Sequence, residues 1–351
     1  MKFSMINYAM LAMLAKSAEG KQEAPCSSDD MVVFGDSLSD TGNLFAITAG
    51  ALPPGTAYTA GRFTNGNVWV EYLADLMKLN PPAPAYDSAN PGGTNYAIAG
   101  AASGSDETIT WTPALTGAPT TLPAKGVRLQ ISDFLEGCGV NCCSSKMLFV
   151  IFVGANDFGL LGEGPNYENI IENIKDSIED LISEAGATKI IVLNLPQIAG
   201  FPAAGGTYTS LFVNQTLPDD LIASLEMYNE RLEDVLTNID TENKDVNIIH
   251  ADIAPLFIEA ATNPAKFGLD DTKDTGIPTL NETALFLQGS LDYLNAENAL
   301  FFDGVHPTTT FHEVLAKEVY RIVKRSKGSK SSKGSKGSKG SKGSKGSKGS
   351  K

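Results

Sequence analysis

The sequence predicts an α/β protein of three layers, in which a mostly parallel β-sheet lies between two layers of helices. Short apolar runs rich in β-branched residues recur along the chain, and amphipathic helical patterns separate them. Strands that alternate with helices are typical of a parallel sheet covered by helices. Composition agrees, because 42% of the 351 residues are hydrophobic and 19% are charged, as in globular proteins with a sizeable core.

Four runs are expected as strands, at residues 31–34, 148–153, 189–195 and 246–249. The second run, Leu-Phe-Val-Ile-Phe-Val, is apolar without interruption, which indicates a strand buried on both faces. A sheet of this kind binds its ligands beyond the carboxyl ends of its strands. Residues that directly follow these runs are therefore the first candidates for a functional site.

Apolar side chains at helical spacing predict helices over residues 170–181, 221–235 and 308–324. Residues 101–125 are rich in Thr, Ala, Gly and Pro and show no period, so a long surface loop is expected there. Loops of that length often act as lids or binding loops. Nothing in the middle of the chain resembles a linker, and one folded domain is expected over residues 28–325.

The two ends of the chain have compositions of their own. Residues 1–20 begin with a lysine at position 2, continue with an apolar stretch and end in small residues, which predicts a secretory signal peptide. The alternative is a disordered or interfacial N-terminus. The Gly/Ser/Lys repeat at residues 326–351 has nothing to bury and is expected to be disordered.

Charge is distributed unevenly between the domain and the repeat. The net charge is −14, and residues 327–351 contribute nine lysines and no acid, so the first 326 residues carry −23. An acidic body argues against nucleic acid as a partner, because phosphate neutralisation needs clustered Lys and Arg. The basic tail is either a solvated extension or an anchor for an anionic surface such as cell-wall polyanion, acidic lipid or silica.

Cysteine usage points to the compartment. An even count fits two disulfides in an oxidising environment, with all three connectivities open among Cys26, Cys138, Cys142 and Cys143. Together with the signal peptide, this predicts a protein that is secreted or resides in the secretory lumen. No segment reaches 18 consecutive apolar residues, so no transmembrane helix is expected.

The first chemical motif follows the first expected strand, in Val-Phe-Gly-Asp-Ser-Leu-Ser-Asp at residues 33–40. This order places Ser37 at the carboxyl end of the strand, and Gly35 permits a sharp turn there. A serine in this place can act as a nucleophile if a base reaches it. The alternative is a serine that caps the N-terminus of a helix.

A base is available in Asp-Gly-Val-His at residues 303–306, just before the last expected helix. On a tight loop this spacing lets the Asp303 carboxylate bind one imidazole nitrogen of His306, while the other nitrogen faces the serine. The alternative is a capping aspartate beside a surface histidine. Ser37, His306 and Asp303 are therefore the candidate nucleophile, base and orienting acid.

With these motifs the chain resembles the GDSL-type esterases and lipases of the SGNH hydrolase family. Its four signature blocks occur in family order at residues 35–43, 95–101, 154–157 and 303–306. Residues 61–69 and 193–196 resemble the extracellular plant, fungal and bacterial branch. The resemblance covers residues 31–324 and implies a flavodoxin-like α/β/α fold. It also implies an oxyanion hole made by the backbone N–H groups of Ser37 and Gly100 and the side-chain amide of Asn156.

The remaining polar candidates are assigned structural roles. His250 follows an expected strand and is interpreted as a structural histidine with its hydrogen bonds satisfied, and His312 is expected on the exposed face of the last helix. Asp40 and Asp157 flank signature blocks and are expected to brace loops. The sequence contains neither a Gly-rich phosphate loop nor a His/Asp metal cluster, so no cofactor and no metal are expected.

The expected function is that of a serine carboxylester hydrolase, an esterase or lipase that works through an acyl-enzyme intermediate. Two alternatives remain open: an acyltransferase that uses the same residues, and a surface-binding protein that acts through its basic tail. The substrate is a small-molecule, lipid or polysaccharide ester. Its acyl and alcohol groups are selected by loops, chiefly residues 101–125 and 270–295.

Overall fold

In the computed structural model, the described residues are 29–53, 58–111, 120–138, 147–158, 166–197, 219–269, 298–303 and 305–334. The expected signal peptide, the loop at 270–295 and the tail beyond residue 334 lie outside them. Of the four cysteines, only Cys138 is described. The expected disulfides and the expected boundaries of the domain therefore stay predictions.

The centre of the fold is a parallel sheet of four strands in the order β1-β4-β5-β6. The four runs expected as strands supply them, which confirms the predicted α/β fold with a mostly parallel sheet. Every residue of β1 and β4 is buried, because helices cover both faces of these strands. The strands are β1 (Met31–Gly35), β4 (Leu148–Phe152), β5 (Lys189–Leu193) and β6 (Asn247–Ala251).

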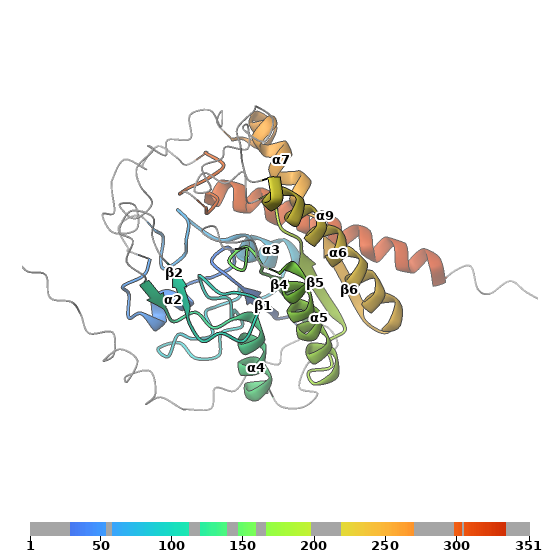
Figure 1. The fold of residues 1–351 in the computed structure, drawn as a ribbon, viewed down its shortest axis with the longest axis horizontal. Coiled ribbons are helices and arrows are strands. Elements are labelled where there is room, and N and C mark those ends of the chain that lie inside the picture. The colour runs from blue at the N-terminus through green and yellow to red at the C-terminus, as the bar shows by residue number, and fades with distance from the viewer. Residues whose placement is uncertain are drawn as a thin grey trace, which may run out of the picture.

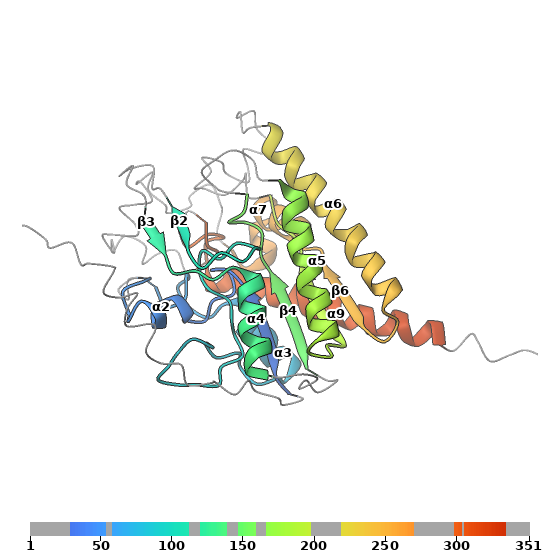
Figure 2. The same ribbon diagram turned by 60° about the horizontal axis from the view of Figure 1, so that its bottom comes forward.

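Helices form a layer on each side of the sheet (Figures 1 and 2). The helices α4 (Val127–Cys138), α5 (Tyr167–Ser183) and α6 (Asp219–Glu242) lie side by side on one face. On the other face α3 (Trp69–Met77) packs along α9 (Thr309–Gly334), which also contacts β6. The shorter helices are α2 (Asn43–Ile47), α7 (Ala254–Thr262) and the 3-10 helix η4 (Pro264–Phe267).

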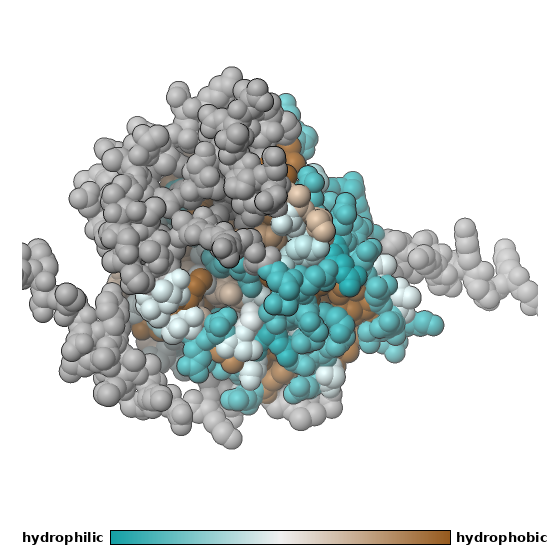
Figure 3. Space-filling view, in the orientation of Figure 1, coloured by the Kyte–Doolittle hydropathy of each residue, from teal (hydrophilic) through white to brown (hydrophobic). Residues whose placement is uncertain are grey.

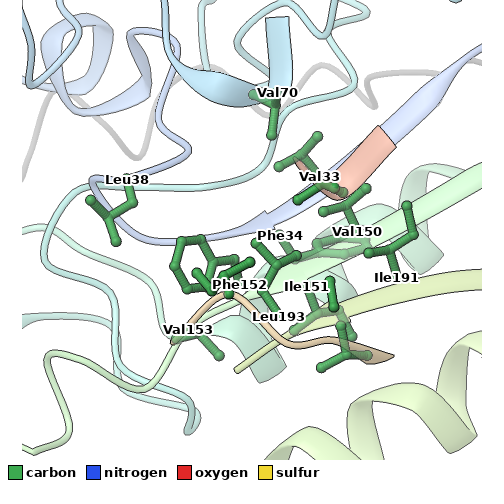
Figure 4. Close-up of a cluster of buried hydrophobic side chains, with 14 of the residues drawn as sticks. Val33, Phe34, Leu38, Val70, Val150, Ile151, Phe152, Val153, Ile191 and Leu193 are labelled. Atoms are coloured by element: carbon green, nitrogen blue, oxygen red, sulfur yellow. The ribbon is translucent and has the colours of Figure 1, made fainter. Parts of the chain in front are cut away.

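The apolar stripes of the helices meet the strands in a single large cluster of buried side chains. Figure 4 shows part of it, where Phe34 of β1 and Phe152 of β4 lie among branched side chains of neighbouring strands. In α5 the buried positions recur at helical spacing, and the Asn166 side chain caps its N-terminus by accepting the N–H of Glu168. Polar residues cover the outer face of α5 and α6 (Figure 3).

Two elements differ from the expectations. The segment expected as a loop at 101–125 contains a two-stranded antiparallel sheet, β2 (Ile109–Trp111) and β3 (Thr120–Leu122), because its Thr and Ile residues favour extended backbone. Helix α9 continues to Gly334, ten residues past the expected end near Lys324. No proline interrupts that stretch, and lysine is a good helix former.

Within the described part of the chain, no helix is long and apolar enough to span a membrane.

Candidate active site

Ser37 lies two residues past the end of β1, at the carboxyl edge of the sheet, and is half-buried. The strand ends at a glycine because it approaches β4 closely: a Cβ on Gly35 would lie 2.3 Å from the carbonyl oxygen of Phe152. The side chain of Gln130 holds this end of β1 from the other side. It accepts the N–H of Gly35 and donates to the Gly35 carbonyl, each at 2.9 Å.

His306 lies within hydrogen-bond distance of Ser37 and Asp303. Its Nε2 is 2.8 Å from Ser37 Oγ, and its Nδ1 is 2.7 Å from Asp303 Oδ2. The other oxygen of Asp303 accepts the backbone N–H groups of Val305 and His306 at 2.8 and 2.7 Å. The structure thus brings together the three residues that the motifs predicted, in the order serine, histidine, aspartate.

Asp303 is buried, yet its environment favours the carboxylate. Burial by itself would raise its pKa, but the neighbouring His306 and three hydrogen bonds to its oxygens hold the pKa below its usual range. An ionised Asp303 can accept a hydrogen bond from Nδ1–H and leave Nε2 free to take a proton from the serine. This is the state that an imidazole needs in order to act as a base toward Ser37.

The segments that carry Gly100 and Asn156 end beside Ser37, one on each side of β1. Residues 94–98 run along the outer edge of β1, with hydrogen bonds that join Val33 to Thr94 and Tyr96. On the opposite edge of β1, β4 leads to Asn156. Three neighbouring chain segments therefore end at the same point of the sheet edge, and each carries one expected oxyanion donor.

Gly100 and Asn156 are held in a defined geometry. Gly100 has a φ of +87°, a conformation that other residues adopt only with strain, and a Cβ there would be 3.0 Å from Ile109 of β2. The Asn156 side chain donates to the carbonyl of Ala101 at 2.9 Å, which ties the two loops together. An amide has a second N–H, so this bond leaves one donor for a ligand.

The expectation that Asp40 and Asp157 brace loops is confirmed. The buried Asp40 carboxylate accepts four backbone N–H groups, from Gly42, Asn43, Leu44 and Ala99. Burial raises the Asp40 pKa to about 6 in spite of these bonds. Asp157 accepts the backbone N–H of Ser103 at 2.9 Å and its hydroxyl at 2.6 Å. The loops that follow β1 and β4 are thereby connected to the loop that contains Gly100.

Comparison with known proteins agrees with this arrangement. The family model of GDSL-like lipases/acylhydrolases matches residues 31–319. The chain belongs to this family. As a GDSL-family hydrolase, it is an enzyme that acts on ester bonds, with a serine esterase/lipase or acyltransferase type of activity.

Named relatives of this GDSL hydrolase come from bacteria and plants. A phosphatidylcholine-sterol acyltransferase of Aeromonas hydrophila is 25% identical, over 88% of this chain and 93% of its own length. A thermolabile hemolysin of Vibrio parahaemolyticus is 27% identical, over 84% of this chain and 64% of its own. The GDSL esterase/lipase At3g53100 of Arabidopsis thaliana is 24% identical, over 82% and 89% respectively.

Solved structures that resemble this GDSL hydrolase are more distant in sequence. A GDSL-like lipase from Parabacteroides merdae is 13% identical with a TM-score of 0.43, over 86% of this chain and 99% of its own. TesA is 16% identical with a TM-score of 0.37, over 85% of this chain and 99% of its own.

Within the described residues of the present chain, no group of three His, Cys, Asp or Glu side chains could hold a metal ion.

Of the two other histidines of this GDSL hydrolase, His312 is not placed as expected. His312 is 1% exposed rather than lying on the surface, and its Nδ1 accepts the backbone N–H of Trp69. Burial and the nearby His306 lower the His312 pKa to about 3, so it is neutral. The expectation was wrong because the face of α9 that carries His312 packs on α3.

His250 was expected to have its hydrogen bonds satisfied, and this is wrong for one nitrogen. Its Nε2 is buried and has no hydrogen-bond partner among the described residues. Burial lowers the pKa of His250 below its usual value, although the charges of Glu233 and Asp252 oppose the shift. The residue lies on β6, the strand farthest from β1 in the sheet, and is not part of the site at Ser37.

Sequence reasoning missed three side chains at the site. Tyr58 donates to Asp303 Oδ2 at 2.9 Å, and the ring of Phe63 lies 5.1 Å from that of His306. Gln130 of α4 holds the end of β1. Phe63 lies inside the conspicuous stretch at 61–69, but Tyr58 and Gln130 belong to no motif. Only the folded chain brings them to the site.

Proposed function

We propose that the chain is a serine carboxylester hydrolase, with Ser37 as nucleophile, His306 as general base and Asp303 as the residue that orients the base. The observation that carries this proposal is the pair of short hydrogen bonds on His306, 2.8 Å to Ser37 Oγ and 2.7 Å to Asp303 Oδ2. A nucleophile, a base and an orienting acceptor in direct contact are the arrangement that acyl transfer to serine requires.

The reaction follows from the geometry. Ser37 Oγ attacks the acyl carbon of an ester while His306 Nε2 takes the hydroxyl proton. The negative oxygen that forms is held by the N–H groups of Ser37 and Gly100 and by the Asn156 amide. When the ester bond breaks, His306 returns the proton to the leaving alcohol, and an acyl-enzyme remains. A water molecule then repeats the sequence and releases the acid.

The proposal is tested by hydrolysis of p-nitrophenyl esters from acetate to palmitate, with the wild type and Ser37→Ala compared. Without the nucleophile, the turnover number is expected to fall about 10⁴-fold or more. The chain length that is cleaved fastest separates an esterase from a lipase. An inert wild type, or a variant that hydrolyses as fast as the wild type, would contradict the proposed mechanism.

Acyl transfer to an alcohol is the second candidate, favoured by the similarity to the phosphatidylcholine-sterol acyltransferase of Aeromonas hydrophila. The same acyl-enzyme would react with an alcohol instead of water, with His306 again taking the proton. An added alcohol acceptor distinguishes the two: a transferase forms the new ester at the expense of free acid, whereas a hydrolase releases acid regardless.

We also propose that the protein is secreted after cleavage of residues 1–20, and that its cysteines form two disulfides. Support comes from the charge and apolar pattern of the N-terminus, from the even cysteine count, and from the folded domain that follows. Mass spectrometry of the protein from its native source tests both ideas. An intact N-terminus, or four free thiols, would contradict them.

The lysine-rich tail is proposed as an anchor for an anionic surface, because it places nine positive charges beyond an acidic domain. Binding of the whole chain to silica particles at low salt is compared with binding of a chain that ends at Arg325. This cut keeps the buried Val323 of α9. Equal binding of both chains would show that the tail does not mediate binding to the surface.

A further inference from the structure

The stretch at 58–72, which the function proposed so far does not use, lies along the chain that carries His306. Thr64 donates its hydroxyl to the Pro307 carbonyl at 2.8 Å, and the side chain of Asn65 accepts the N–H of Thr309 at 2.8 Å. Further along, Trp69 donates its N–H to His312. The loop of the candidate base is thus fixed against this stretch on the side that leads into α9.

Tyr58 begins this stretch, and its hydroxyl reaches the site itself. The side chain is 4% exposed, and the hydroxyl donates to Asp303 Oδ2 at 2.9 Å. Its ring packs edge-on against Phe302, with centroids 5.2 Å apart, and also contacts Phe63. The neighbouring rings leave the tyrosine little freedom, so the hydroxyl is held at its place before any substrate binds.

The carboxylate of Asp303 is therefore fixed through both oxygens. Oδ1 accepts the two backbone N–H groups of its own loop, and Oδ2 accepts from Tyr58 as well as from His306 Nδ1. Two donors at Oδ2 define the plane of the carboxylate and hence the direction in which it meets the imidazole. A donor at this oxygen also disperses the negative charge of the carboxylate. The carboxylate then stabilises a protonated His306 ring less strongly.

We propose that Tyr58 is a positioning residue for the reaction, which acts through Asp303 by aligning the carboxylate with His306 and by moderating its negative charge. The inference rests on the proposed function, because it assigns Tyr58 a task in the same serine–histidine–aspartate arrangement. Tyr58 acts through its hydroxyl group. Its ring serves only to place that group.

The test replaces Tyr58 by Phe, which keeps the ring packing and removes the hydroxyl. The turnover number on a p-nitrophenyl ester is expected to fall about tenfold, with KM changed less than twofold. Without the Tyr58 donor the carboxylate attracts the proton on His306 more strongly, so the acidic limb of the kcat/KM profile moves to higher pH. Loss of packing alone would not move that limb.

Tyr86→Phe is the matched control, because Tyr86 also donates its hydroxyl to an aspartate, Asp133 of α4, at 2.7 Å. Its activity and pH profile should equal those of the wild type. Asp36 and His312 also interact electrostatically with His306, and both variants retain them. A shift in the Tyr58 variant alone is therefore a shift at Asp303.

A double-mutant cycle completes the test. If Tyr58 acts through Asp303, Tyr58→Phe should change the residual activity of an Asp303→Ala enzyme less than twofold. A tenfold loss that persists in the Asp303→Ala background, or a Tyr58→Phe enzyme with wild-type turnover and pH profile, overturns the inference. An inactive wild type or an active Ser37→Ala enzyme overturns the proposed function instead, so the two failures are distinguishable.

Discussion

Asp36 precedes Ser37 in the chain and Asp303 binds His306, yet the protein holds the two carboxyl groups in opposite states of ionisation. Hydrogen bonds and the neighbouring imidazole keep the pKa of Asp303 low. Asp36, the residue before Ser37, is buried, and one of its oxygens accepts the backbone N–H of Leu38 at 3.0 Å. Burial raises its pKa from 3.8 to about 7. A negative charge next to the nucleophile is thus disfavoured at neutral pH and below.

The raised pKa of Asp36 predicts how this residue makes the free energy of unfolding depend on pH. Because its pKa is higher in the folded than in the unfolded protein, its contribution to the free energy of unfolding is complete below about pH 4 and is lost as pH rises through about 7. Asp36→Asn keeps the acceptor for Leu38 and cannot ionise. Relative to wild type, the variant should gain stability between pH 4 and pH 8, on the order of a few kcal/mol.

Urea unfolding of both proteins at several pH values measures this gain. The difference between variant and wild type is the quantity of interest, because the low pKa of His312 makes stability fall toward acid pH and opposes the slope from Asp36 in the wild type. A difference that is constant between pH 4 and pH 8 would show that Asp36 is ionised to the same extent in both states.

At the scale of elements, the site depends on loops that follow adjacent strands and are bonded to one another. The loop after β4 carries Asn156 and Asp157, and both hold the segment at 100–103, through Ala101 and Ser103 respectively. Asn173 of α5 adds a hydrogen bond to the Ser103 hydroxyl at 3.0 Å. Gly100 and Asn156, the two proposed oxyanion donors outside the serine loop, are therefore held in fixed positions relative to each other.

Asp157→Ala is expected to lower the turnover number about 10- to 100-fold with little change in KM. The variant leaves the Ser103 N–H without its acceptor and lets the Gly100 loop move away from the position of the transition-state oxygen. Steady-state kinetics with a p-nitrophenyl ester measure the effect. Ser103→Ala keeps the backbone bond from Ser103 to Asp157 and removes only the hydroxyl bonds to Asp157 and Asn173, so it should have a smaller effect. Equal turnover in wild type and Asp157→Ala would contradict this role.

At the scale of the whole molecule, the sheet provides the rigid support on which the site is assembled. Its strands are buried between two helical layers, and the polar residues of the site stand at the carboxyl edge. Ile151 of β4 is fully buried within the core (Figure 4). Stability of the domain and the geometry of the site therefore depend on the same packing.

Ile151→Ala should lower the free energy of unfolding by about 2–5 kcal/mol, because the removed side-chain atoms leave a cavity that the surrounding strands cannot close. Met227 of α6 is 50% exposed and is the matched control, since Met227→Ala should change stability by less than about 0.5 kcal/mol. Chemical denaturation monitored by circular dichroism measures both. Similar losses in the two variants would argue against a close-packed centre at β4.

Much of the fold could be predicted because local patterns decide it. Runs rich in apolar and β-branched residues become the strands, and residues at helical spacing become the faces of α5, α6 and α9 that pack on them. The motifs also identify Ser37, Asp303 and His306 as candidate site residues, since Gly35 at the strand end and the three-residue spacing of Asp303 and His306 are local features. The order of the signature blocks indicates the family without any knowledge of distances.

Only the tertiary structure decides which side chains meet. Ser37 and His306 are 269 positions apart, and Tyr58 and Asp303 are 245 apart, so no local pattern relates them. His312 was expected at the surface for the same reason: the helical pattern of α9 does not reveal that α3 covers it. A hydrogen bond forms only if donor and acceptor lie within a few tenths of an ångström of their ideal separation. That accuracy arises from the packing of the whole core rather than from the chemistry of any one segment.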